Sequence, residues 1–348
     1  MSRKGLGAIL LILGLVLVVG GLVVMLVIVP GMKQWPEDVD TIRTYSGTMP
    51  VLLNPQNFEF LRDLEVDIQR HVRTEETDGE VALVSEAQLL ETGGQPLQQV
   101  FKQYAIDRKT MLVTDEYPEE WATRDGFWPR EGLVIGWPID SEAEDYPGWS
   151  DDYRATVTLV YEGEEEHARS EMDTYKYTAS SGPQPIAPEA VEQMGLPPAL
   201  PADQLMGLIE QADLSPMVAQ MLPSLLERLE GDTVPLQYYY EYEAEYWVEP
   251  QTGVLIDTTK HELRKVGLAP EVTEGSPLAA LPEDQQANLR VPVFELTYTA
   301  TDESVQDAKD DAQENIDRLN LYGTYLPIAA IVVGAVLALL GLLFAVRS

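Results

Sequence analysis

The sequence predicts an α+β protein, namely a mainly antiparallel β ectodomain between an N-terminal and a C-terminal transmembrane helix. Two uncharged apolar runs, residues 6–29 and 326–346, each have about the 20 residues that a helix needs to cross a bilayer. Between them, apolar and polar side chains alternate in many segments, as is typical of strands with one buried face. We expect these strands to form a large twisted sheet or an incomplete barrel, interrupted by an amphipathic helical insertion.

The first apolar run is expected to remain in the protein as a membrane anchor. A cleaved signal peptide has an apolar core of roughly 7–15 residues and a small-residue cleavage site. This run has 24 residues, and its end from Val27 to Gly31 does not fit such a site. We therefore interpret it as an uncleaved signal anchor.

Charge sets the expected orientation. Residues 30–325 carry a formal charge of −38, because all 58 acidic residues but only 20 of the 23 basic residues lie there. The other basic residues, Arg3, Lys4 and Arg347, flank the apolar runs, and basic residues stay preferentially on the cytoplasmic side. This distribution predicts a two-pass plasma-membrane protein with both termini cytoplasmic and the acidic middle extracytoplasmic.

Composition also limits the partners and the compartment. The chain has no cysteine, whereas large extracytoplasmic domains of eukaryotes commonly use disulfides, so a bacterial or archaeal envelope is favoured. A surface with this much negative charge should avoid nucleic acid and anionic lipid headgroups.

The clearest strand is Val234–Val248, where valine, leucine and tyrosine alternate with glutamates. Turn residues follow it, and Gly253–Val266 is expected to return as its antiparallel partner. Further strands are expected at Leu64–Arg73, Val81–Leu90, Leu97–Ala105, Lys109–Val113, Ala155–Tyr161, Asp173–Thr178 and Leu289–Thr299.

The helical insertion is expected in the second half of the chain. Residues 181–201 contain six prolines, which suits an extended arm. Leu205–Ala212 and Met217–Leu229 have the apolar spacing of two amphipathic helices, and Pro223 should kink or split the second. Residues 270–288 are expected to form a second proline-containing loop.

A last helix leads into the second membrane run. Thr301 and the two acidic residues after it suit a helix N-terminus, and Pro327 allows a break at the membrane entrance. Both spans carry small residues at helical spacing, which lets helices approach closely in lipid. We therefore expect the spans to pair, within one chain or between chains, through Gly7, Gly14 and Gly21 and through Ala330, Gly334, Ala338 and Gly341.

These expectations divide the chain into eight parts. They are a cytoplasmic N-terminus (1–5), transmembrane helix 1 (6–29), a β-rich ectodomain part (30–180), the Pro-rich arm with the amphipathic helices (181–231), a second β-rich part (232–300), a juxtamembrane helix (301–325), transmembrane helix 2 (326–346) and a cytoplasmic C-terminus (347–348). Whether the two β-rich parts form one domain or two is left open by the sequence.

No residue pattern predicts a catalytic, cofactor-binding or metal site. The chain has neither G-x-S-x-G, Ser-x-x-Lys nor a Walker motif, and His71, His167 and His261 lack metal-ligand spacing. The acidic segment Asp140–Asp152 could offer oxygen ligands to calcium, but it lacks the order of an EF-hand and is more typical of a solvated loop.

Several short motifs resemble a known family. They are Gly136-Trp137-Pro138-Ile139, Tyr146-Pro147-Gly148-Trp149-Ser150-Asp151, the strand Ala155–Glu162, Tyr175-Lys176-Tyr177, Trp247–Gly253 and the helix from Thr301 into the membrane. In this order they are similar to a bacterial membrane family that is common in actinobacteria and described as PorA-type or of unknown function. The resemblance implies an envelope protein with two membrane helices around a β-rich domain.

We therefore predict a non-enzymatic, doubly anchored envelope protein with a structural, assembly or protein-interaction role. Its partners would be the lipid bilayer and other copies of itself or other envelope proteins. The alternative is a binding or transfer module for a lipid or other apolar ligand near residues 205–229, whose methionines suit adaptable apolar contacts. A pore is less favoured because neither span has a polar stripe, and an enzyme is the weakest interpretation.

Overall fold

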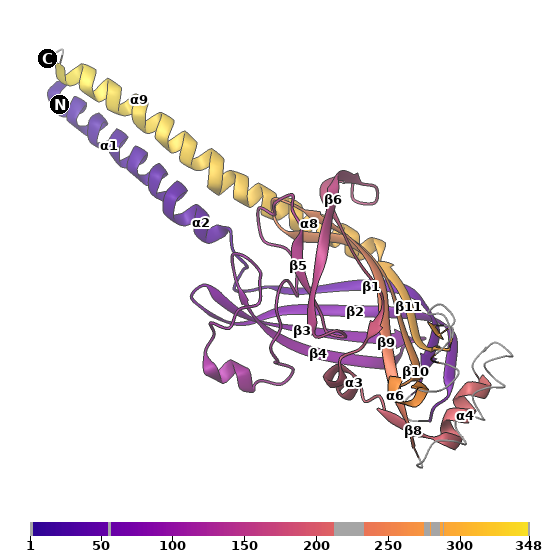
Figure 1. The fold of residues 1–348 in the computed structure, drawn as a ribbon. Helices are drawn as coiled ribbons and strands as arrows, with labels where there is room; N and C mark the ends of the chain where they lie inside the picture. The colour runs from indigo at the N-terminus through magenta and orange to yellow at the C-terminus, as the bar shows by residue number, and fades with distance from the viewer. Residues whose placement is uncertain are drawn as a thin grey trace.

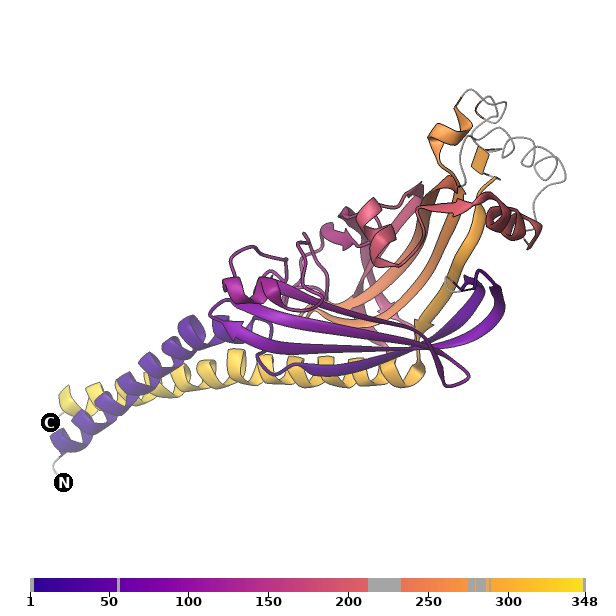
Figure 2. The ribbon, with the colours of Figure 1, turned by 90° about the horizontal axis from the view of Figure 1, so that it is seen from below.

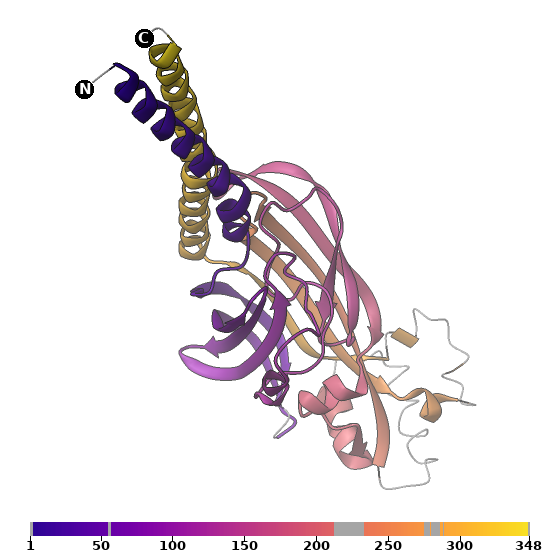
Figure 3. The ribbon, with the colours of Figure 1, turned by 90° about the vertical axis from the view of Figure 1, so that its left-hand side faces the viewer.

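The molecule consists of a strongly curved β domain from which two long helices project side by side (Figure 1). The structure is a computed structural model that describes residues 3–54, 57–211, 233–274, 279, 286–287 and 289–346. Both termini lie together at the far end of the helix pair (Figure 3). The second expected amphipathic helix, Met217–Leu229, lies outside the described residues.

The strands form one antiparallel sheet in the order β4-β3-β2-β1-β11-β10-β9-β7-β6-β5, with β8 paired to β9. The strands are β1 (Asp40–Leu53), β2 (Phe60–Asp78), β3 (Val81–Thr92), β4 (Gln95–Asp107), β5 (Tyr146–Ser150), β6 (Ala155–His167), β7 (Met172–Pro185), β8 (Ala199–Pro201), β9 (Thr233–Glu249), β10 (Val254–Leu268) and β11 (Val291–Ala300). The predicted mainly antiparallel β fold and the β9–β10 hairpin are confirmed. Strands from both expected β-rich parts belong to this sheet, which is bent into a half-barrel (Figure 2).

One central strand, β1, was missing from the sequence prediction. Its residues Tyr45, Met49 and Leu53 are nevertheless buried at alternating positions. Pro50 lies at the point where the β1–β11 register shifts between Thr48 and Val51, and a bulge is where a sheet tolerates a residue without an N–H group. The short strands β5 and β8 were also missed.

Two expected segments were wrong. Lys109–Val113 is not a strand, because Asp107 Oδ1 accepts hydrogen bonds from the backbone N–H groups of Lys109 and Thr110 and closes a turn. Only isolated bridges follow at Leu112 and Val113. The proline-rich stretch 181–201 is not a continuous extended arm, because β7 occupies its beginning and the helix α3 (Pro188–Gln193) starts at a proline, whose fixed φ suits a first helical turn.

Three further short helices accompany the sheet. They are the 3₁₀ turn η2 (Glu119–Thr123), α4 (Ala202–Gln211) and α6 (Pro270–Thr273). Helix α4 matches the expected first amphipathic helix and buries Leu205 and Leu208.

The juxtamembrane and membrane helices are continuous, so the expected break at Pro327 is wrong. Helix α8 (Asp302–Asn320) passes through a π-helical turn, η4 (Leu321–Tyr325), into α9 (Leu326–Val346). The N-terminal helix repeats this arrangement, with α1 (Arg3–Val23), the π-turn η1 (Val24–Ile28) and α2 (Val29–Met32), which contains Pro30. In each helix the wider π-turn immediately precedes the proline, which accommodates its missing N–H group and its ring.

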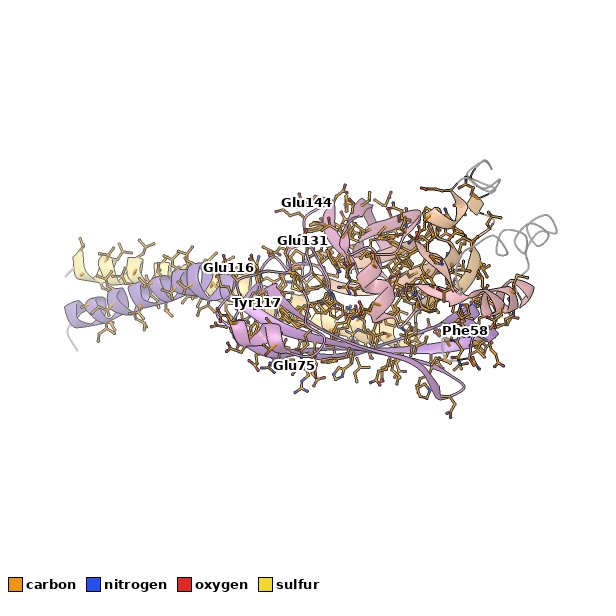
Figure 4. The ribbon with its side chains drawn as sticks, turned by 60° about the horizontal axis from the view of Figure 1, so that its bottom comes forward. Phe58, Glu75, Glu116, Tyr117, Glu131 and Glu144 are labelled. Carbon is orange, nitrogen blue, oxygen red and sulfur yellow. The ribbon has the colours of Figure 1, made fainter. Side chains whose placement is uncertain are left out.

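The concave side of the sheet is filled by the long connection between β4 and β5. Leu133, Ile135 and Trp137 from this connection join the main core with inward side chains of β2, β3, β7 and β9. Side chains occupy the space between the two halves of the sheet (Figure 4).

Helix α8 packs where the sheet opens. Strand β11 ends at Ala300, short of the beginnings of β1 and β10, and Val305 and Ala308 of α8 pack there with Tyr45 of β1 and Ile256 of β10. The helix that enters the membrane is therefore embedded in the sheet domain.

Candidate functional site

The two membrane helices meet through their small residues within one chain, as one of the two expected arrangements. A Cβ atom built on Gly14 would collide with the backbone of Gly334 and Ala338. A Cβ on Gly7 would lie 2.9 Å from the Gly341 carbonyl oxygen, and one on Gly21 would lie 2.8 Å from that of Pro327. The two backbones therefore touch along the length of both helices, at positions where only glycine fits.

Three of the motifs that carry the family resemblance, those of Trp137, Tyr177 and Gly253, meet in the core. The Trp137 ring lies 5.2 Å from the Tyr177 ring and 5.4 Å from the Tyr246 ring. Gly253, with φ of +71°, packs under the carbonyl groups of Trp137 and Pro138, where a side chain would collide. The residues of these motifs therefore form the contact between the β4–β5 connection, strand β7 and the β9–β10 turn.

A belt of paired charges crosses the interior next to this core. Glu86 accepts hydrogen bonds from Arg70 Nε at 2.6 Å and from the Tyr104 hydroxyl at 2.5 Å. The Arg70 and Lys102 charges and these hydrogen bonds outweigh the effect of burial and lower the pKa of Glu86 to about 2. Burial and the Glu86 charge raise the pKa of Tyr104 well above its ordinary value.

Two further carboxylates, Asp151 and Asp152, extend this network of paired charges inside the half-barrel. Asp151 receives Lys102 Nζ at 2.7 Å and Arg130 Nε at 3.0 Å, and these two cations hold its pKa well below the usual range despite its burial. Arg264 binds both carboxylate oxygens of Asp152, at 2.7 and 3.0 Å. Each of these carboxylates is paired with a cation in the interior of the domain. We therefore interpret the belt as a structural network that fills the half-barrel.

The acidic segment Asp140–Asp152 does not gather its carboxylates around one point. Asp140 pairs with Lys33, and Asp145 accepts a hydrogen bond from the backbone of Tyr161, while Asp151 and Asp152 belong to the interior belt. Across the described part of the chain, no three His, Asp or Glu side chains are grouped to hold a metal ion.

The three histidines lie far apart in the sheet. His71 pairs with Asp40 and His261 with Glu295 at the surface, whereas His167 is buried at the end of β6. Sequence reasoning treated the three alike, and only His167 has partners that resemble a catalytic arrangement.

His167 lines an open cleft of about 830 Å³ on the outer face of the sheet. The floor comes from β1, β11, β10 and β9, and the walls come from the end of β6, the β6–β7 turn and the start of α8. Arg169 joins these walls, because it donates to Asp257 of β10, to the Ala300 carbonyl and to Asp302 of α8, each at 2.8 Å.

The buried wall of the cleft contains a Ser–His–Asp relay. Ser170 Oγ lies 3.0 Å from His167 Nδ1, and His167 Nε2 lies 3.1 Å from Asp257 Oδ2. A hydrolase needs an accessible nucleophile. Ser170 is only 1% exposed, and Asp257 Oδ2 is shared with Arg169, so the relay fastens the β6–β7 turn to β10 and does not present a nucleophile.

The apolar-ligand hypothesis concerned residues 205–229, of which the structure describes the first part. Leu205 and Leu208 of α4 close over Phe60 and Leu236 at a space of about 30 Å³, roughly one water molecule. Phe58, two residues before Phe60, lies at the end of the β domain away from the helix pair (Figure 4). Glu116 and Tyr117 mark the opposite end, near the helices. The described part of this helix therefore acts as a lid on the core.

Comparisons with known proteins agree with the resemblance in the motifs. A porin named Porin PorA, from Corynebacterium resistens, is 24% identical over 332 residues, which cover 82% of this chain and 77% of the relative. A MaoC domain protein dehydratase from Chloroflexus aurantiacus covers 86% of this chain and 87% of its own at 10% identity, with a TM-score of 0.12. The family described as Porin PorA matches residues 6–343, so this chain belongs to that family.

Proposed function

We propose that this membrane-associated envelope protein is a two-pass, non-enzymatic module with cytoplasmic termini and an extracytoplasmic domain that serves structure, assembly or protein interaction. The observation that carries the proposal is the joint between membrane and ectodomain. The helix α8–α9 runs unbroken from the sheet into the apolar span, and α1 packs along it through glycine. Such a joint holds the ectodomain in one orientation, as a scaffold requires.

The orientation follows from charge. In the sequence, Arg3 and Lys4 precede the first apolar run and Arg347 follows the second, whereas all acidic residues lie between the two runs, which suits a cytoplasmic location for both ends. The two apolar helices Gly5–Met32 and Asp302–Val346 have the length and composition to span a bilayer.

Labelling of introduced cysteines tests the orientation, because the chain has no cysteine of its own. A membrane-impermeant maleimide should label Gln98→Cys, on the exposed edge strand β4, in intact cells. It should label Ser2→Cys and Ser348→Cys only after lysis. Labelling of the two terminal positions in intact cells would contradict the proposal.

The name of the Corynebacterium relative raises a pore as the second candidate. A pore from one copy would need a polar path, whereas the hollow of the half-barrel holds packed side chains and the outward residues of α1 and α9 are apolar. Conduction would therefore require several copies. Purified protein in a planar bilayer should give no conductance steps, and reproducible steps that scale with protein concentration would favour the pore.

The apolar-ligand alternative is tested by native mass spectrometry of protein extracted in mild detergent. We expect masses of the chain or of defined multimers without an adduct. A stoichiometric apolar adduct that is lost when Leu208→Asp is introduced at the lid would replace the structural role by ligand binding.

A further inference from the structure

We propose that the outer cleft beside His167 binds a neutral saccharide. The cleft volume of about 830 Å³ lies within the range of roughly 300–1,000 Å³ of sites that hold small ligands. It is open to solvent on the face of the ectodomain away from the packed interior, so an extended glycan can enter. The inference goes beyond the scaffold role, and neither depends on the other.

The floor of the cleft carries a row of hydroxyl groups in register on three neighbouring strands. Ser46 of β1 is paired with Thr299 of β11, and Thr299 is paired with Thr259 of β10. These three residues have the same parity as Trp247 and Asp257, so all of them point to the outer face. Neighbouring strands lie about 4.8 Å apart, and each hydroxyl can both donate and accept a hydrogen bond, as sugar hydroxyls do.

An aromatic side chain stands beside this row. Trp247 is half-buried, and its indole Nε1 donates to Glu165 near the end of β6. The centres of the His167 and Trp247 rings lie 5.2 Å apart, so His167 packs against the indole and limits its movement. Lys176 Nζ lies 5.0 Å from the centre of the Trp247 ring, but Trp247 still lines the cleft. The part of the indole that borders the cleft supplies apolar surface for sugar C–H groups, next to hydroxyls and carboxylates that suit sugar O–H groups.

The charges around the cleft select against anions. Glu165, Glu166, Asp257 and Asp302 line it, and Arg169 is the one Arg or Lys side chain in its lining. Lys176, over the Trp247 ring, is paired with Glu245 at 2.7 Å. Arg169 is already bound to two of these carboxylates. A phosphate or an acidic sugar would meet net negative charge, whereas a neutral polyol meets donors and acceptors without a charge penalty.

Three of the four carboxylates that line the cleft are also poorly available to a cationic ligand. Asp257 is paired with Arg169 and His167, Asp302 with Arg169, and Glu165 with the Trp247 indole. Exchange of these contacts for a ligand ammonium would break existing pairs. A neutral saccharide uses the hydroxyl row and the indole and leaves the pairs in place.

Binding is tested with the full chain in a detergent without a sugar headgroup, because a maltoside would compete. The probes are maltohexaose, cellohexaose, xylohexaose and mannohexaose, with hexagalacturonate and spermidine as charged controls. We expect at least one neutral hexasaccharide to bind with a Kd on the order of 1 mM in calorimetry, and to change the tryptophan fluorescence. The two charged controls should bind at least about tenfold more weakly.

Variants locate the site. Thr299→Val and Thr259→Val keep the shape of the side chain and remove one hydroxyl each, so each should weaken binding roughly 3–10-fold. Thr297→Val is the matched control, since Thr297 lies on the same strand and face as Thr299 but outside the cleft, and it should leave the Kd unchanged. Trp247→Phe should abolish the fluorescence change and weaken binding, and melting temperatures report whether each variant is folded.

The proposal is overturned if none of the four hexasaccharides binds at about 50 mM, a concentration well above the expected Kd. It is equally overturned if folded Thr299→Val and Thr259→Val bind like the unchanged protein, or if spermidine or hexagalacturonate binds as tightly as the neutral probes. None of these results depends on the orientation of the chain in the membrane.

Discussion

The helix pair and the interior of the sheet pack by opposite means. In the helix pair, Gly14 and Gly334 bring two backbones into contact by having no side chains at all. In the sheet interior, large side chains meet, and Glu86 and Asp151 are buried with the cations that neutralise them. Lipid offers no hydrophobic drive between apolar helices, so close contact must hold the pair together. The water-facing domain gains from burial of apolar surface and can support buried pairs within it.

Removal of one partner of a buried pair should have the largest effect. Arg70→Met removes the cation bonded to the buried Glu86 and leaves only Lys102, itself paired with Asp151, to offset the Glu86 charge. The free energy of unfolding should therefore fall by about 3–5 kcal/mol. Urea unfolding of the full chain in mild detergent, followed by tryptophan fluorescence, measures it.

The control for this pair is the double variant Arg70→Met, Glu86→Leu. It removes both charges and should recover most of the loss, because an apolar pair can replace a buried ion pair. A single variant as stable as the unchanged protein would mean that water reaches Glu86, and the contrast with the helix pair would fail.

The helix pair should respond to side chains that are added. Gly14→Leu forces a side chain into the backbone of α9 and should cost about 1–3 kcal/mol of helix association. Gly20→Leu, on the same helix, has no atom of a neighbour within 4 Å and should cost nothing.

Energy transfer between labels on Ser2→Cys and Ser348→Cys, during titration with SDS, follows separation of the helices. The ectodomain should unfold in urea as before in both glycine variants. Equal midpoints in SDS for Gly14→Leu and Gly20→Leu would show that the glycine contacts do not hold the pair.

Acid should weaken the sheet domain and spare the helix pair. The folded pKa of Glu86, about 2, lies below its ordinary value of 4.5, so its charged form stabilises the fold. The stabilisation is fully present above about pH 5 and is lost as the pH falls toward 2, with a loss on the order of 2 kcal/mol. Urea midpoints between pH 7 and 2.5 measure the total acid effect, to which Asp151 also contributes. The Arg70→Met, Glu86→Leu variant should lack the part due to Glu86 and therefore lose less stability than the unchanged protein.

The elements that the sequence predicts well are those with a strong period. The alternation of tyrosine and glutamate in β9 and the two apolar runs are long enough to define a strand and two helices without tertiary information.

Strand β1 was missed because its bulge at Pro50 is set by the register with β11, a strand about 250 residues further along the chain. Pairing between distant strands is not encoded in either one alone.

The cleft was not predictable for a related reason. Asp257 faces His167 and Trp247 only because the β9–β10 register shifts between Leu255 and Asp257. Uninterrupted alternation would have paired Asp257 with Tyr246 on the inner face. The three glutamates that precede His167, Glu164–Glu166, gave no hint of its buried partner Asp257, which lies 90 positions further along the chain.

The smallest effect is expected at Thr301, where the sheet domain and the membrane helix join. Its hydroxyl accepts a hydrogen bond from the Ser304 N–H group at 3.1 Å and caps α8, and it lies 2.7 Å from the Thr44 hydroxyl of β1. Thr301→Ala removes the cap and should cost about 1 kcal/mol in urea unfolding. Thr301→Ser keeps the oxygen and should recover most of the lost stability.

If α8 is a rigid link between the two regions, the loss should appear in the urea midpoint and leave the SDS midpoint of the helix pair unchanged, since the α1–α9 contacts lie beyond the π-turn η4. A shift of both midpoints would mean that fraying of α8 reaches the membrane span, and the two regions would then not be independent.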